Sequence, residues 1–381
     1  MPKKEEYCEV RAGGRVYRDW TAVSVVDQFD AWARSFALEL VEVGDFGKGP
    51  AAVKLKTGDP CDITLAGKSV IEGGYIEVRQ VSYDARRHGI AVQGRSKAGD
   101  MVDSSVDVPG GQFRDYTLEA IANRVLKPFG ATFTLKNAPE GAKKPIKDVS
   151  VQHGETVHEF LERISRKLGV LITGDEKGNL IGGHPDAKVT ADLQEGVNIL
   201  SAQGATTDLY ATHKIKVHGQ NKGSDEEYGE AASQIAAEAT NPGIRKQRTT
   251  ILLSEEPGTQ KELQQRADME TRKQASTMLN VSIVVAGWTK PNGELWKSGE
   301  FLTVKSPMLF PNESGLMRLA VQQVTFTQDS ESGTTSTLNL VLPQFLTKGM
   351  EQESDTGSGT LYNPASTEAV PAPSPQAETS T

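Results

Sequence analysis

The strongest constraint on the fold is a change in hydrophobic periodicity along the chain. Up to about residue 105, apolar side chains such as Phe36, Leu38 and Leu40 alternate with other residues. Between about 106 and 190 the spacing becomes helical, and it then returns to alternation. A period of two buries one face of a strand, whereas a period of 3.6 buries one face of a helix. The chain is therefore predicted to be mainly β, with an inserted α+β domain.

Two helices are predicted within the insertion. The first carries an apolar stripe over 118–126 and ends before Pro128. The second begins at Thr156, which with Glu159 has the spacing of a capping box, and it ends at Gly169.

The length of 381 residues indicates several domains, because a single hydrophobic core rarely extends beyond about 250–300 residues. A third, mostly polar helix is predicted over 260–279, and the residues after about 346 are too polar to form a core. We expect a first small β-barrel domain (1–105), the α+β insertion (106–190), a return strand and connecting segment (191–250), a helix with a second, similar β-barrel domain (251–346) and a disordered tail (347–381).

The composition argues against several classes of protein. The net charge of −8 argues against a dedicated nucleic-acid binder, which needs a basic face. No apolar run is long enough for a transmembrane helix, and residues 1–7 lack the apolar segment of a signal peptide. Cys8 and Cys61 are expected to be reduced and buried, since no paired cysteine motif is present.

Two β segments resemble each other. Residues 76–83 (IEVRQVSY) and 319–326 (LAVQQVTF) both have apolar residues at positions 1, 3, 6 and 8. The alternation slips by one after the third position, which is typical of a β-bulge or bend. Gly58-Asp precedes the first segment as Gly299-Glu precedes the second. We interpret this as an internal repeat, with two unrelated hairpins as the alternative.

The sequence contains only weak matches to catalytic or ligand-binding motifs. Residues 66–69 (AGKS) resemble the end of a phosphate-binding loop, but Asp62 stands where that motif needs glycine and a strand-like stretch follows. His153 and His158 lack the spacing of a metal site, because His153 precedes the helix cap. No catalytic residue, metal site or cofactor is therefore expected, and the protein is not predicted to be an enzyme.

A local excess of basic side chains lies around the first repeated segment. It is either a solvated hairpin face or a patch that contacts an acidic partner or lines a channel. Two tryptophans bracket a later turn and are expected to anchor that hairpin in the core or at an interface. The basic residues are Arg79, Arg86, Arg87, His88, Arg95 and Lys97, and the tryptophans are Trp288 and Trp296.

The chain resembles the baseplate hub proteins of contractile phage tails, of the kind found in Mu-like phages (the tail protein P family). The resemblance is carried by the opening hairpin 10–25, by the elbow 94–105 (GRSKAGDMVDSS), and by 287–299, where Trp288 and Trp296 flank Gly293. Together these stretches span most of the chain up to about residue 345.

This resemblance implies a virion structural protein, made in the host cytoplasm, that forms a trimeric ring between a sixfold tail tube and a threefold central spike. Tube, spike and other baseplate proteins would be its partners, DNA would only pass through the lumen, and no membrane would be involved. Arg95 and Asp100 would pin the elbow as the junction to the insertion. A hub of a phage-derived bacteriocin or secretion particle is the same class. A cell-wall hydrolase or a binding module for carbohydrate or protein remains the alternative.

Overall fold

The computed structural model describes most of the chain before the polar tail. The described residues are 6–43, 54–84, 87–186, 188–209, 211–220, 235–254, 258–310 and 315–343. The segment predicted to be a disordered tail lies outside them.

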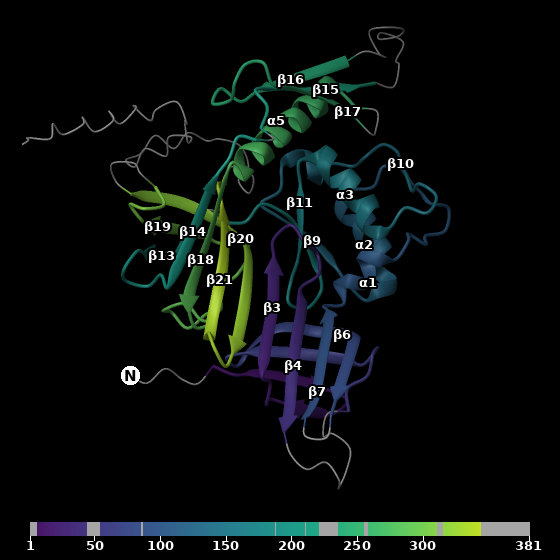
Figure 1. The fold of residues 1–381 in the computed structure, drawn as a ribbon. Helices are drawn as coiled ribbons and strands as arrows, with labels where there is room; N and C mark the ends of the chain where they lie inside the picture. Colours follow the sequence, from purple (N-terminus) through teal and green to yellow (C-terminus); the bar gives the residue numbers. More distant parts are fainter. Residues whose placement is uncertain are drawn as a thin grey trace, which may run out of the picture.

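The first part of the chain forms seven strands, as the alternation predicts (Figure 1). Gly13 and Gly14 adopt positive φ angles in the turn between the first two strands, which glycine tolerates best. The strands are β1 (Cys8–Ala12), β2 (Arg15–Tyr17), β3 (Ala22–Gln28), β4 (Ser35–Val43), β5 (Pro60–Leu65), β6 (Lys68–Tyr83) and β7 (Arg87–Arg95).

The last part of the chain contributes six more strands to the same sheet. They are β13 (Val189–Gln194), β14 (Ser201–Thr206), β18 (Leu279–Ala286), β19 (Phe301–Lys305), β20 (Leu316–Asp329) and β21 (Gly333–Val341).

The two β parts are joined edge to edge rather than folded as separate barrels. Strand β3 pairs antiparallel with β20, so the strand order runs β14-β18-β21-β20-β3-β4-β7-β6-β5-β1-β2, with β13 attached through β19. One core includes Val25 and Leu38 from the first part and Val324 and Leu338 from the second. Among the described residues the strand path does not close on itself. The described residues therefore do not form the two separate closed barrels that were expected, since β3 of the first part pairs with β20 of the second.

The internal repeat is visible in the topology. The order β3-β4-β7-β6-β5 in the first part matches β14-β18-β21-β20-β19 in the second. Both long strands are bulged, β6 at Glu77 and β20 at Gln322. Gly58 donates its amide to the Ile76 carbonyl, as Gly299 does to that of Val321, at 2.7 and 2.8 Å. These shared features favour a true repeat over two unrelated hairpins.

The structural alignment of β6 with β20 is shifted by two residues from the alignment of 76–83 with 319–326 that the sequence suggested. Residue 76 corresponds to 321 rather than 319, because both immediately precede the bulge. Away from the bulge, a shift of two positions keeps a side chain on the same face of a strand, so the sequence pattern did not separate the two alignments.

The insertion is a compact α+β domain with its own core. The capping box at Thr156 and the left-handed cap at Gly169 are both present, as predicted. The expected elbow contains a short helix that the sequence did not indicate. The elements are α1 (Ala98–Asp103), β8 (Gln112–Phe113), α2 (Leu118–Leu126), the 3-10 turns η1 (Lys127–Phe129) and η2 (Glu140–Lys143), β9 (Phe133–Lys136), β10 (Val149–Ser150), α3 (Val157–Leu168), β11 (Leu171–Gly174) and β12 (Leu180–Gly183).

A further small unit lies between β14 and β18. Its three strands, β15 (Lys214–Gly219), β16 (Ile235–Thr240) and β17 (Thr249–Leu253), form a sheet that packs against α5 (Gln260–Thr277) around a separate core. The predicted boundary at about residue 250 is therefore wrong, since the 260–279 helix belongs with this sheet rather than with the following strands (Figure 1).

Candidate interaction surfaces

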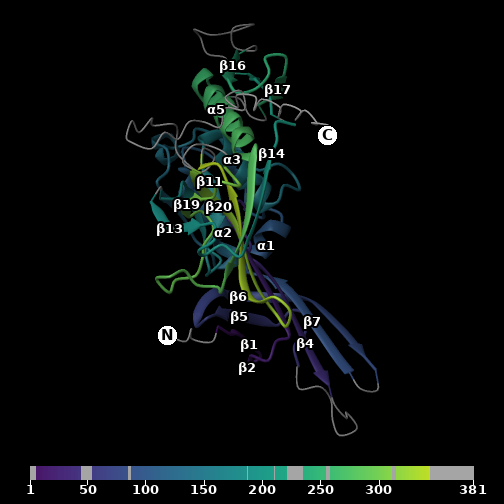
Figure 2. The same cartoon turned by 60° about the vertical axis from the view of Figure 1, so that its left-hand side comes forward.

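The outer ends of β4, β6 and β7 extend beyond the rest of the first β part (Figure 2). Residues of all three strands line an open hollow of about 550 Å³. Val81 and Tyr83 are 55% and 83% exposed on this extension. Large apolar side chains at such exposure on a protruding sheet indicate a contact surface for another molecule.

The predicted basic patch is only partly gathered on this extension. Arg79 is exposed on β6, and His88 stands edge-on to Tyr83 with ring centroids 6.0 Å apart. Arg87 begins β7, while Arg86 lies outside the described residues. A role for these cations as partner or lumen contacts stays a proposal.

Arg95 lies at the junction to the insertion, and its predicted role as a partner or lumen contact stays a proposal. Its guanidinium pairs with Glu77 at 2.8 Å and also with Asp103. These hydrogen bonds raise the pKa of Arg95 and lower that of Asp103. Asp103, one turn further along α1, therefore takes the place predicted for Asp100, and burial raises the pKa of Asp100.

Lys97 is also turned toward the insertion. Its aliphatic stem crosses Gly178 so closely that a Cβ there would lie 2.4 Å from the Lys97 Cγ. Its amine donates to the Gly130 carbonyl at 3.4 Å. Arg95 and Lys97 are thus structural side chains of the elbow, separate from the cations of the β extension.

Trp32 is a second junction residue, which the sequence did not single out. It follows β3, yet its side chain is buried in the core of the insertion. Its indole N–H donates to Glu162 at 3.2 Å, and its ring packs edge-on to His158 at 4.7 Å. The backbone of Gly174 approaches so closely that any Cβ would collide with the Trp32 carbonyl. An isolated tryptophan in a loop gave no periodic signal for this contact.

Trp288 and Trp296 anchor their hairpin in the core. Both are almost fully buried, and the Trp288 indole donates to the Thr327 carbonyl at 3.0 Å. The Trp288 amide also donates to the Glu6 carboxylate, which joins the start of the chain to this late hairpin. Of the two roles expected for these residues, the core role is the one the burial supports.

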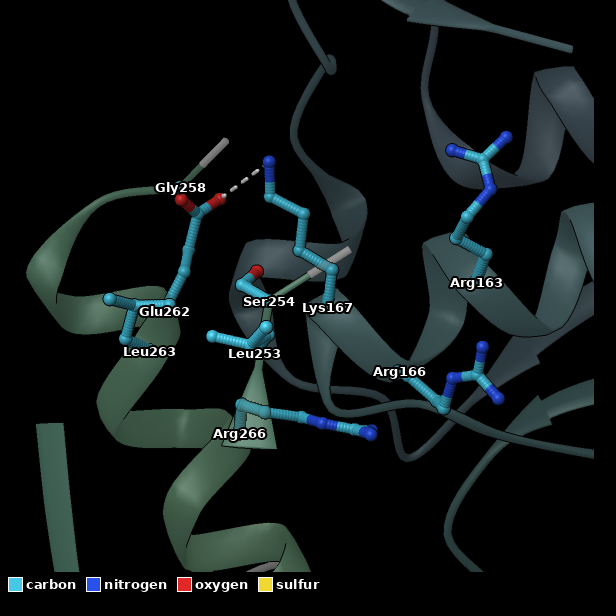
Figure 3. Close-up of a pocket in the computed structure, with 9 residues that line it drawn as sticks. All are labelled: Arg163, Arg166, Lys167, Leu253, Ser254, Gly258, Glu262, Leu263 and Arg266. Carbon is cyan, nitrogen blue, oxygen red and sulfur yellow. Dashed lines mark ion pairs between the residues drawn. The ribbon is translucent and has the colours of Figure 1, made fainter. Parts of the chain in front are cut away.

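A basic cleft lies between α3 of the insertion and α5 (Figure 3). It encloses about 40 Å³, and an ion pair of 3.6 Å between Lys167 and Glu262 spans it. Arg163 on the same helix is instead committed to a buried pair with Glu155 at 2.7 Å. At this volume the cleft has room for only a few water molecules, so we interpret it as a contact between two domains.

Within the described part of the chain, no group of three or more His, Cys, Asp or Glu side chains could hold a metal ion. No helix in that same part is long and apolar enough to cross a membrane. The AGKS motif forms the turn from β5 into β6, with Ala66 and Gly67 at positive φ.

Comparison with known proteins agrees with this architecture. Residues 7–96 match the family described as Mu phage baseplate assembly protein GpP-like, N-terminal, and residues 98–183 match the second domain of the gp44-like baseplate hub proteins. The chain is 27% identical over 335 residues to the baseplate hub protein gp44 of Escherichia phage Mu, covering 87% of this chain and 86% of that protein.

Solved structures show the same fold. The 43 kDa tail protein of prophage MuSo2 from Shewanella oneidensis has a TM-score of 0.79 at 27% identity, covering 90% of this chain and all of that one. A tail protein from Neisseria meningitidis MC58 has a TM-score of 0.75 at 19% identity, with 90% and 98% coverage.

Proposed function

We propose that this chain is a baseplate hub protein like those of Mu-like phages, and that three copies of it form a ring at the centre of a tail baseplate. The hub is a structural part of the phage tail. In the proposal, the ring adapts a sixfold tail tube to a threefold spike, and DNA passes through its lumen.

The repeated strand order carries the proposal. The sheet of one chain contains two segments with the same strand order, β3-β4-β7-β6-β5 and β14-β18-β21-β20-β19. Three chains arranged around one axis would therefore present six similar units from three subunits. Such a ring can contact a sixfold partner with one end and a threefold partner with the other.

Tube, spike and other baseplate proteins are the proposed partners, and assembly is proposed to take place in the host cytoplasm. No catalytic step is needed for this role. The proposal requires only that the subunits close around a lumen and expose different surfaces at its two ends.

The proposal predicts an assembly with a mass near three times 41.1 kDa. Light scattering of the full-length protein, alone and mixed with its spike protein, measures this directly. A species that remains monomeric or dimeric at every concentration, with and without the spike, would contradict the trimeric ring.

A further inference from the structure

The small unit formed by β15, β16, β17 and α5 is joined to the main sheet where β14 ends and β18 begins (Figure 1). The two strands pair there, with Thr206 opposite Leu279. Just beyond this pair, the Thr207 amide donates to the Met278 carbonyl at 2.8 Å. The chain therefore enters and leaves the unit at the same place, through two segments that lie side by side.

The small unit has a hydrophobic core of its own. Strands β15 and β16 supply this core from one side, and α5 supplies it from the other. Its buried side chains belong neither to the core of the main sheet nor to that of the insertion. Movement of the whole unit would therefore leave all three cores intact. The buried residues of the unit's core are Ile215, Val217, Ala237, Ala239, Leu263 and Ala267.

Charged side chains line the cleft between the small unit and the insertion. They include Arg166 and Lys167 of α3 and Glu262 and Arg266 of α5 (Figure 3). The Lys167 amine and the Glu262 carboxylate are 3.6 Å apart, and each side chain is 29% exposed. Partly exposed ion pairs contribute little to stability and are weakened by salt. Polar contacts of this kind permit one domain to move relative to its neighbour.

A second charge contact between α3 and α5 has the opposite polarity. Burial raises the pKa of Glu162 on α3, and the Lys273 amine of α5 is among the positive charges that act against this rise. Helix α3 thus offers a lysine to a glutamate of α5, and a glutamate to a lysine of α5. Two contacts of opposite polarity favour one docked orientation, and both depend on ionic strength.

Leu253 of β17 shows that the docked position is not tightly packed. This side chain lines the cleft, yet it is 80% exposed. A contact closed by apolar packing would cover such a residue, because burial of a leucine side chain is favourable. The cleft is therefore held by charges more than by apolar packing.

We propose that the small unit rocks as a rigid body about the crossing of Thr207 and Met278, and that the charge contacts between α3 and α5 hold it against the insertion. Such a hinge requires changes in the dihedral angles of only a few residues at the ends of elements. The inference concerns a single chain and does not depend on the proposed ring. The movement would leave β14 and β18 paired, so the position of α5 could change without any change in the main sheet.

Distances between spin labels on the small unit and the insertion test the hinge. The double variant Lys127→Cys/Lys261→Cys carries the labels at exposed positions, with Lys261 in the first turn of α5, at the end far from Met278. The native Cys8 and Cys61 should not be labelled, because both are buried and burial raises the pKa of each thiol to about 12. Co-expression with an excess of the unaltered chain keeps labelled copies apart in any assembly. Double electron–electron resonance should show two distances or a broad range.

The matched control is Lys68→Cys/Lys127→Cys, in which Lys68 is exposed at the start of β6. This pair should give a single narrow distance. The contacts of Trp32 with Glu162 and of Arg95 with Asp103 tie the insertion to the sheet, so the two labels should not move relative to each other.

The charge contacts are tested with the labels at positions 127 and 261. Lys167→Glu should increase the fraction of the longer distance roughly fivefold, because it places two carboxylates across the cleft. Sodium chloride at about 1 M should act in the same direction without any substitution. Lys147→Glu makes the same charge change at an exposed residue before β10 and should leave the distances unchanged.

A single narrow distance between positions 127 and 261, altered neither by salt nor by Lys167→Glu, would overturn the hinge. Broadening of the control pair as well would place the motion at the insertion and would also overturn it. Two distances whose proportions ignore both salt and Lys167→Glu would overturn the role of the charge contacts.

Discussion

At the scale of single residues, the contact of Trp32 with Glu162 makes the junction between sheet and insertion sensitive to pH. Burial raises the pKa of the Glu162 carboxyl, although His158 and the Trp32 indole act in the opposite direction. An acid whose folded pKa is raised stabilises the fold most when it is protonated. Its contribution is present below the unfolded pKa and is lost as the pH rises through the folded pKa.

We therefore expect Glu162→Gln to raise the melting temperature at pH 7 to 8 and to have little effect near pH 4. The amide carbonyl can still accept the hydrogen bond from Trp32, but it carries no charge to bury. Thermal unfolding followed across this pH range is the measurement. Trp32→Phe, which removes the indole donor together with part of the buried ring, serves as a comparison that should lower the melting temperature at both pH values. An equal shift at both pH values would show that ionisation of Glu162 has no part in stability.

Residue-level prediction from the sequence succeeded where the signal was local. The Thr156 capping box and the Gly169 cap depend on neighbours within one helix, so their spacing was sufficient. Trp32 and the pair of Arg95 with Asp103 depend on how an insertion docks on a sheet. Contacts of that kind leave no periodic trace in the sequence.

At the scale of secondary-structure elements, the equivalent glycines Gly58 and Gly299 offer a comparison between the repeats. Both precede the short strand of their repeat and have φ angles near +85° and +81°. A Cβ at Gly58 would meet open space, whereas at Gly299 it would lie 2.6 Å from the Phe29 ring. The turn at Gly299 in the second repeat therefore packs against Phe29 of the first. The equivalent turn at Gly58 makes no such contact with the second repeat.

Gly58→Ala should lower the free energy of unfolding by about 1–2 kcal/mol, the cost of a left-handed conformation for a residue with a Cβ. Gly299→Ala should lower it by about 2–5 kcal/mol, since displacement of Phe29 adds an overpacking cost. Chemical denaturation of the two variants provides the measurement. Equal losses would mean that the Phe29 ring moves aside freely.

The bulges show why the sequence predicted the right kind of feature in both strands but aligned the two strands incorrectly. The slip in alternation correctly indicated a bulge in both β6 and β20. The equivalent positions were nevertheless two residues apart from the sequence match. Away from the bulge, side chains two positions apart share a face, so hydrophobicity alone does not separate the two alignments.

At the scale of the whole molecule, the sequence indicated two β parts around an insertion. It did not indicate that the two parts form one continuous sheet. Local alternation identifies strands without identifying their partners, and the pairing of β3 with β20 joins residues about 300 positions apart. Contacts beside this seam strengthen it. The buried Asp27 pairs with Arg34 and also accepts the Ser298 amide at 3.1 Å.

Arg86 and Arg87, adjacent in the sequence between Tyr83 and His88, bear on how the proposed ring would join its neighbours. Two arrangements are physically reasonable for Arg86 and Arg87: they contact acidic loops of the tube or spike, or they line the channel. A channel that gripped many phosphates would impede DNA, whereas a few charge pairs can hold a protein partner firmly. We favour the protein contact, because the chain has a net charge of −8 and these cations are concentrated at one hairpin.

Arg86→Glu/Arg87→Glu should then block assembly of tail particles while the purified protein keeps its fold and trimeric mass. Particle yield by electron microscopy and mass by light scattering measure the two effects. Lys143→Glu/Lys144→Glu makes the same charge change at exposed positions of the insertion, so it should assemble normally. Normal particles that fail only in DNA delivery would instead place the arginines in the channel. Particles that assemble and deliver DNA normally would show that the hairpin face is merely solvated, and the charge of the tip would have no role in joining the hub to its neighbours.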